Sequence, residues 1–188
     1  MNIRLAYARM DSPVGPVWVA TTGIGICTVG LGAGQPEFFA WLSRHVGPEP
    51  PREDVETLAP ALAQLREYFS RTRREFDLPL DVRGTAFQRA VWAEVAHIPY
   101  GATTTYGEIA QRIGRPGAAR AVGAAVGANP LPILIPCHRV IGAGGSLTGY
   151  GGGLEVKAAL LRLEGALLEA LPPLRLGVRE AEIRLIHY

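Results

Sequence analysis

Residues 136–140, Pro-Cys-His-Arg-Val, place a soft nucleophile beside a titratable base at the end of an apolar run. Only the thiolate form of cysteine is a good nucleophile, and a free thiol with a pKa of about 8.5 is mostly protonated at neutral pH. The imidazole of His138 could accept the proton of Cys137. The pair therefore predicts nucleophilic chemistry at Cys137. The alternative is a buried cysteine that only packs, which is common for free cysteines.

The local geometry restricts how Cys137 and His138 can cooperate. Neighbouring side chains on an extended segment point to opposite sides, so we expect a water relay or a local turn set by Pro136. Glu164 lies at the end of a helix predicted over 154–164, where the helix dipole opposes a carboxylate. It therefore needs a compensating partner, and His138 is a candidate. The alternative for Glu164 is a solvated residue at a helix end.

The composition limits the class of protein. The chain has 188 residues, of which 48% are apolar and 19% are charged, and it contains only two cysteines. These values predict a folded chain without a disulfide framework, in a reducing, cytoplasmic setting. Neither a secretory signal nor an apolar run of ~20 residues is evident, so we expect no membrane association. We expect Cys27 to pack inertly, and the four histidines show no metal-ligand spacing.

The N-terminal half has the pattern of a small sheet followed by helices. Alternating segments bounded by turn residues predict a β-meander, and helical spacing of apolar residues follows. The predicted strands are near 3–10, 16–22 and 26–31, and the predicted helices are 36–46 and 54–70. We predict an α/β (α+β) fold class, with a small N-terminal antiparallel-sheet-plus-helices domain at 1–83 and a mainly helical C-terminal domain at 84–188.

The C-terminal half opens with two capping boxes, in which a Thr is followed three residues later by Gln or Glu. They are Thr85 with Gln88, and Thr105 with Glu108. A further helix is predicted over about 117–127. The second and third helices make a helix-turn-helix candidate at about 105–127, and an ordinary pair of core helices is the alternative.

The helix predicted over 117–127 consists almost entirely of small residues. Val122 and Val126 form an inward stripe, and Arg120 is its one long side chain. A helix with ordinary side chains is ~10–12 Å wide, whereas the minor groove of B-DNA is ~6 Å wide. A slim helix with one cation therefore suits a widened minor groove. Close packing against another helix is the alternative.

The order and spacing of motifs across the C-terminal half resemble the O6-alkylguanine-DNA alkyltransferases. The matching segments are 85–88, 91–92, 98–101, 105–110, 119–123, 129–130, 135–140, 149–150, 153–154 and 163–165. The N-terminal half resembles the family only in its general layout.

The resemblance implies a role for each matching residue of the reaction centre. Cys137 would accept the alkyl group, His138 would act as its base through a bridging water, and Glu164 would orient His138. Tyr106 would protonate the departing guanine and press on a backbone phosphate. Asn129 would brace the turn that joins the helix-turn-helix to the cysteine.

The resemblance also implies the contacts to DNA. Arg120 would fill the stack left by the flipped base, and the expected DNA-binding residues are Arg120, Tyr106, Arg115, Ala119 and Gly123. Arg115 is a phosphate partner or, alternatively, a solvated turn residue. The base pocket would be lined by Val140, Tyr150 and Gly151. Some members of the family have Ser where this chain has Gly151, so a hydroxyl contribution is lost there while backbone donation is retained.

The activity implied is single-turnover DNA repair. An alkyl group would pass from O6-alkylguanine, and also from O4-alkylthymine, to Cys137 as an irreversible thioether after base flipping. The expected partner is double-stranded DNA, bound through its minor groove by a monomer that is cytoplasmic and nucleoid-associated. No cofactor or metal is expected. The alternatives are a lesion-binding relative without transfer activity, a helix-turn-helix regulator, and a Cys-His-Glu hydrolase that turns over repeatedly.

Overall fold

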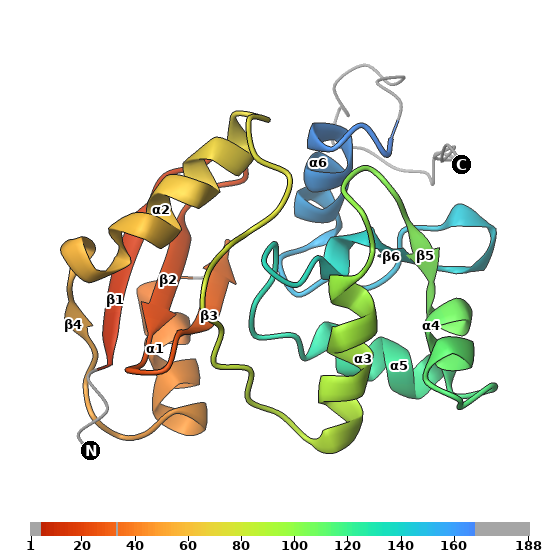
Figure 1. Cartoon of the computed structure of the whole chain (residues 1–188), viewed down its shortest axis with the longest axis horizontal. Coiled ribbons are helices and arrows are strands. Elements are labelled where there is room, and N and C mark those ends of the chain that lie inside the picture. Colours follow the sequence, from red (N-terminus) through yellow and green to blue (C-terminus); the bar gives the residue numbers. More distant parts are fainter. Residues whose placement is uncertain (1–4, 33, 168–188) are drawn as a thin grey trace.

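The computed structural model describes residues 5–32 and 34–167, and its course is shown in Figure 1. Strands β1 (Ala6–Met10), β2 (Val17–Thr21) and β3 (Ile26–Leu31) form the predicted antiparallel meander. A short strand β4 (Arg52–Glu53) pairs parallel with β1, so the sheet is mixed and has the order β3-β2-β1-β4. The prediction missed β4 because its two exposed, charged residues carry no apolar alternation.

Helices α1 (Gln35–His45) and α2 (Val55–Phe69) cover opposite faces of this sheet and agree with the predicted ranges to within one residue. Val19 of β2 lies in the buried cluster that contains Leu62 of α2. Its neighbour Ala20 lies in the cluster that contains Leu42 of α1. Successive strand residues point to opposite faces, and both faces are covered, which explains why every residue of β2 is buried.

The C-terminal part is built from helices α3 (Ala86–Ala96), α4 (Tyr106–Arg112), α5 (Ala119–Gly127) and α6 (Leu154–Leu163). Both predicted capping boxes form, at the starts of α3 and α4. α3, α4 and α5 contact one another, and α5 begins two residues later than the predicted helix. Strands β5 (Thr104–Thr105) and β6 (Val140–Ile141) pair parallel, which the sequence did not predict because each has only two residues.

The sheet and the C-terminal helices share one buried core. Its members include Ala8 and Val29 from the sheet and Val91 and Leu160 from the helices. Two hydrogen bonds also join the parts, because the backbone amide of Val29 and the hydroxyl of Thr28 both donate to the Pro130 carbonyl, each at 2.9 Å. The segment that leads to Cys137 is thus anchored on β3.

The boundary predicted at 83–84 stays a prediction. The predicted C-terminal domain also includes residues 168–188, which lie outside the described residues. No helix within residues 5–32 and 34–167 is long and apolar enough to cross a membrane.

Candidate functional site

Cys137 lies in a tight turn rather than on a strand. Residues Cys137–Arg139 form one turn of 3₁₀ helix directly after Pro136, and the backbone amide of Arg139 donates to the Pro136 carbonyl at 2.9 Å. The segment is therefore not extended, and the local turn after Pro136 that the sequence analysis named as one possibility is present. Cys137 is a free thiol, 5% exposed, and it borders a cavity of about 280 Å³.

The environment of the Cys137 thiol acts on its pKa in two directions. Burial raises the pKa because the thiolate is poorly solvated there. A hydrogen bond with the Asn129 side chain, the positive charge of Lys157 and the hydroxyl of Tyr150 oppose this effect. Asn129 is itself held in place, since its amide donates to the Ile135 carbonyl at 2.8 Å and its oxygen accepts from the Leu131 amide at 3.0 Å.

His138 and Glu164 form a buried pair behind the thiol turn. The Nε2 of His138 donates to Oε1 of Glu164 at 2.8 Å, and both side chains are fully buried. Since Nε2 carries the hydrogen, the lone pair of neutral His138 is on Nδ1. Nδ1 is buried and has no hydrogen-bond partner among the described residues. Burial lowers the pKa of His138, although Glu164 acts against this effect, so the imidazole is held neutral.

Glu164 is the centre of a larger network than the sequence indicated. It accepts from both sides of the Arg139 guanidinium, at 2.8 and 2.9 Å, and from the Tyr68 hydroxyl at 2.7 Å. Burial opposes its ionisation, but the hydrogen bonds from His138 and Arg139 and the positive charge of Arg139 outweigh it and lower its pKa to about 2. The alternative of a solvated helix end is therefore wrong. His138, the compensating partner considered for a carboxylate at a helix C-terminus, is bonded to Glu164.

Three functional candidates escaped the sequence analysis: Arg139, Tyr68 and Lys157. Lys157 is the only lysine of the chain and is fully buried on α6. Its Nζ donates to the carbonyls of Val140 at 2.6 Å and Thr148 at 2.9 Å, and burial lowers its pKa to about 8. A lone lysine between the apolar positions of a helix was the available signal. The signal for Arg139 was a cation inside the mostly apolar run 131–141.

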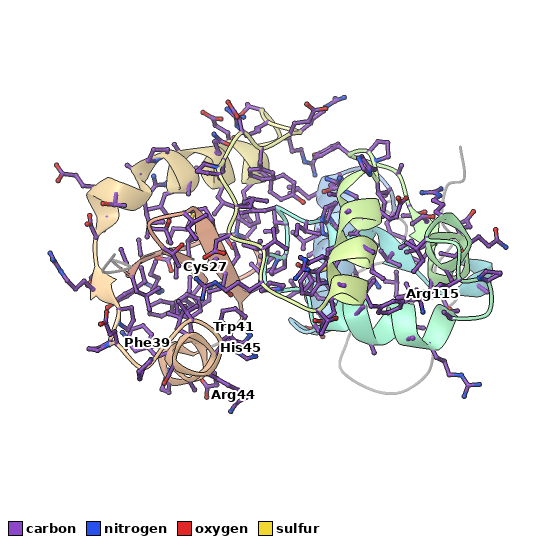
Figure 2. The ribbon with its side chains drawn as sticks, turned by 60° about the horizontal axis from the view of Figure 1, so that its bottom comes forward. Cys27, Phe39, Trp41, Arg44, His45 and Arg115 are labelled. Carbon is purple, nitrogen blue, oxygen red and sulfur yellow. The ribbon has the colours of Figure 1, made fainter. Side chains whose placement is uncertain are left out.

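The cavity at Cys137 lies between the two parts of the chain. Glu37, Phe38 and Trp41 of α1 form one side, and the segment with Tyr150 and Gly151 forms another. Trp41 stacks on His45 at a centroid distance of 4.4 Å, and Figure 2 shows both on the side of α1 that faces the C-terminal part. Asn129 borders the same cavity. Of the predicted pocket residues, Val140 is fully buried in β6 and does not line it.

A second, more open hollow of about 670 Å³ adjoins the first at Tyr150. It brings together Tyr106 of α4 and Arg120 of α5, and it also includes Ala119 and Gly123. The Tyr106 hydroxyl donates to the Thr148 carbonyl at 3.4 Å, and the ammonium of Lys157 lies 5.9 Å from the centre of its ring.

Arg115 lies apart from these residues. Its guanidinium is 5.8 Å from the centre of the Phe87 ring, and Figure 2 shows it in the C-terminal part of the chain. Cys27 is fully buried on β3, and burial raises its pKa to about 12. Among the described residues, no cluster of three or more His, Cys, Asp or Glu side chains could hold a metal ion.

Comparison with known proteins identifies both parts of the chain. Residues 5–82 match the "6-O-methylguanine DNA methyltransferase, ribonuclease-like domain", and residues 86–166 match the "DNA binding domain" of the same family. The methylated-DNA–protein-cysteine methyltransferase of Mycobacterium tuberculosis is 48% identical over 158 residues, covering 84% of this chain and 91% of the relative. The corresponding protein of Methanosarcina acetivorans is 44% identical over 160 residues, covering 85% and 98%.

Solved structures agree with this assignment. The crystal structure of M. tuberculosis OGT in complex with DNA is 46% identical and has a TM-score of 0.74, covering 85% of this chain and 92% of that one. A methyltransferase structure from Methanococcus jannaschii is 27% identical, with a TM-score of 0.59, covering 90% of this chain and 100% of that one. The similarity thus extends across the sheet, the helices and the cysteine turn, and the chain belongs to the 6-O-methylguanine DNA methyltransferase family.

Proposed function

We propose that this chain repairs DNA by moving an alkyl group from O6 of guanine onto Cys137, once per molecule. The observation that carries the proposal is that the thiol at the cavity wall is followed directly, in the same turn, by a buried imidazole of fixed tautomer. Family membership and a relative solved with DNA support the same activity. The cavity beside the thiol is comparable with the smaller ligand pockets of proteins.

His138 prepares the nucleophile. The lowered pKa of Glu164 keeps the carboxylate ionised, and the carboxylate fixes the imidazole with its lone pair on Nδ1. The proton of Cys137 passes through a bridging water to Nδ1, and the resulting imidazolium is stabilised by Glu164. Lys157 and Asn129 stabilise the thiolate that forms, which offsets part of the effect of burial.

The transfer itself is a displacement at carbon. The thiolate attacks the alkyl carbon, the carbon–sulfur bond forms, and the carbon–oxygen bond to O6 breaks. The electron pair of that bond remains on the guanine, which takes up one proton as it leaves, with Tyr106 as the donor. The thioether has no means of returning the alkyl group, so the chain acts as reagent and catalyst together.

The hollow beside Tyr150 is the proposed path to the duplex. The lesion is buried in the base stack, and extruding it costs a few kcal/mol, less for a poorly paired base. α5 enters the minor groove of double-stranded DNA, and Arg120 takes the place of the extruded base. Tyr106 contacts a backbone phosphate, and Arg115 contacts another from the turn before α5. Gly151 and Tyr150 hold the extruded base beside Cys137.

Intact mass distinguishes this activity from its alternatives. Incubation with an oligonucleotide carrying O6-methylguanine should add one methyl group to the chain, at one equivalent, and peptide mapping should place it on Cys137. Continued release of product would indicate a hydrolase, and DNA binding without a change in mass would indicate a lesion sensor or regulator. Either result would overturn the proposal.

The variant Cys137→Ala serves as the control for the modified position. It should take up no methyl group and should retain its affinity for the damaged duplex, because the thiol contributes little contact area. Cys27→Ala is the matched cysteine variant and should transfer normally, since Cys27 is buried on β3 and does not line the cavity.

A further inference from the structure

We propose that Tyr68, on helix α2 of the N-terminal part, is a positioning residue for the His138–Glu164 pair. Through its hydroxyl, the N-terminal part of the chain sets both the orientation and the proton affinity of the relay. The inference rests on the proposed function, in which His138 accepts the proton of Cys137, and it assigns the sheet-and-helix half a part in that reaction.

The contact that carries the inference joins residues far apart in the chain. The Tyr68 hydroxyl donates to Oε1 of Glu164 at 2.7 Å, and this oxygen also accepts from His138 Nε2 at 2.8 Å and from Arg139 Nη2 at 2.9 Å. The other oxygen, Oε2, accepts from Arg139 Nε at 2.8 Å and from the Gly101 amide at 3.2 Å. Tyr68 and His138 therefore share a single acceptor atom.

Tyr68 is held rigidly enough to act as a fixed donor. It is fully buried, on the same side of α2 as Leu58, Leu62 and Leu65, which pack in the core under the sheet. Its ring makes an edge contact with Tyr100 at a centroid distance of 6.2 Å. Burial and the nearby charge of Glu164 raise the pKa of Tyr68, so the hydroxyl keeps its proton throughout the working pH range.

Because Oε1 of Glu164 accepts from both Tyr68 and His138, the Tyr68 hydroxyl changes how strongly the carboxylate stabilises the protonated imidazole. A donor on Oε1 draws charge from the carboxylate, which weakens its stabilisation of protonated His138. It also limits rotation of the carboxylate and so directs the lone pair on Nδ1. Removing the hydroxyl should therefore raise the proton affinity of His138 and loosen its orientation. The charged and titratable groups around His138 are Lys157 from α6, Glu164 directly after α6, Tyr68 from α2, and Cys137 and Arg139 from its own turn.

The test is the variant Tyr68→Phe, which removes the hydroxyl and keeps the ring. Single-turnover rates of methyl uptake are measured against pH, with the reactive fraction of each preparation determined by intact mass. We expect uptake to remain at one equivalent and the rate at neutral pH to fall about tenfold, as is common when a residue supporting a catalytic group is lost. We also expect the acidic limb of the pH profile to move to higher pH, because His138 binds its proton more tightly.

The matched control is Tyr100→Phe. The Tyr100 hydroxyl donates to the Leu163 carbonyl at 3.1 Å, one residue from Glu164, and so does not supply one of the hydrogen bonds to the carboxylate. Its removal should leave the pH profile in place. If Tyr68→Phe shows the wild-type pH midpoint, or behaves as Tyr100→Phe does, the inference is overturned while alkyl transfer by the wild-type chain stands. Failure of the wild-type chain to take up any methyl group would instead overturn the proposed function.

Discussion

The thiol of Cys137 is kept protonated at rest although it is surrounded by groups that favour its ionisation. Burial raises its pKa, and Asn129, Lys157 and Tyr150 act against that increase. Lys157 acts by its charge, because its ammonium is bonded to the carbonyls of Val140 and Thr148 rather than to sulfur. A protonated thiol is protected from oxidation, since susceptibility follows thiolate character. In the proposed mechanism, ionisation then depends on His138.

Replacing Lys157 with Met should slow the reaction of Cys137. Loss of the nearby positive charge destabilises the thiolate, and each unit by which the thiol pKa rises lowers the thiolate fraction about tenfold at neutral pH. We expect the rate of iodoacetamide labelling at Cys137 to fall about tenfold and its pH midpoint to rise. Since Lys157 itself loses its proton near pH 8, the difference from wild type should shrink at higher pH.

The control for Lys157→Met is Arg162→Met, which removes a partly buried cation from the same helix. Arg162 is not among the groups that shift the pKa of Cys137, so this variant should label as wild type does. An unchanged midpoint in Lys157→Met would contradict the electrostatic role.

Helix α5 presents two different surfaces. Val122, Ala125 and Val126 are buried against α3 and α4, and the Trp92 indole donates to the Ala125 carbonyl at 2.7 Å. The exposed residues of the helix are Arg120, Ala121, Ala124 and Gly127. The inward stripe expected from the sequence is thus confirmed, and the helix keeps a narrow outer surface from which Arg120 alone extends.

Bulk on this outer surface should weaken DNA binding without unfolding the chain. In Ala124→Leu the added side chain projects into solvent, so the free energy of unfolding should stay within about 0.5 kcal/mol of wild type. Affinity for duplex DNA should fall about tenfold or more, because the helix no longer fits closely against a groove. Ala63→Leu, at an exposed position of α2, is the control in titrations of labelled duplex. Equal affinities for both variants would contradict the groove contact of α5.

Arg120→Ala tests the stacking role separately from binding. Without the side chain, the extruded nucleotide returns to the stack more readily, so methyl uptake from duplex DNA should slow about tenfold. Reaction with free O6-methylguanine base, which needs no extrusion, should be unchanged. Equal slowing of the two reactions would remove the stacking role.

Arg115→Ala, by contrast, should weaken binding of damaged and undamaged duplex alike and lower its salt dependence.

The whole molecule is joined by buried polar contacts as well as by an apolar core. Thr28 and Val29 bond to Pro130, and Tyr68 bonds to Glu164. A buried carboxylate with this many donors is ionised in the folded chain over almost the whole pH range. The stability of the fold is therefore linked to pH through the same residue that orients His138.

Acid should destabilise the chain through Glu164. In the unfolded chain this carboxyl takes up its proton near pH 4.5, whereas in the folded chain its pKa is about 2. Between these values the unfolded state binds more protons, so stability falls as pH falls, by roughly 3 kcal/mol in total. Urea unfolding from about pH 6 to about pH 2.5 should show this loss in wild type and a shallower slope in Glu164→Gln.

Glu155→Gln is the control for the acid experiment, because it neutralises an exposed carboxylate on the same helix. It should retain the wild-type slope. The same slope in Glu164→Gln and wild type would show that another group governs acid unfolding.

Short-range signals were sufficient for most of the elements. The capping boxes at Thr85 and Thr105 begin α3 and α4, since a cap needs only a side chain and an amide three residues later. Gly165, at a positive φ of 78°, follows the C-cap residue of α6, a position that favours glycine. The adjacency of Cys137 and His138 also predicted nucleophilic chemistry at Cys137, because residues next to each other in the chain are close in any fold.

The partners of the buried charges could not be found in this way. Arg139, Lys157 and Tyr68 owe their roles to the packing of α2 and α6 around the cysteine turn, and α1 borders the cavity from a distant segment. The type of a residue shows that its charge needs a partner when it is buried, but it does not show which segment of the chain supplies that partner. That choice depends on how the helices and the sheet pack, and so it is made only when the chain folds.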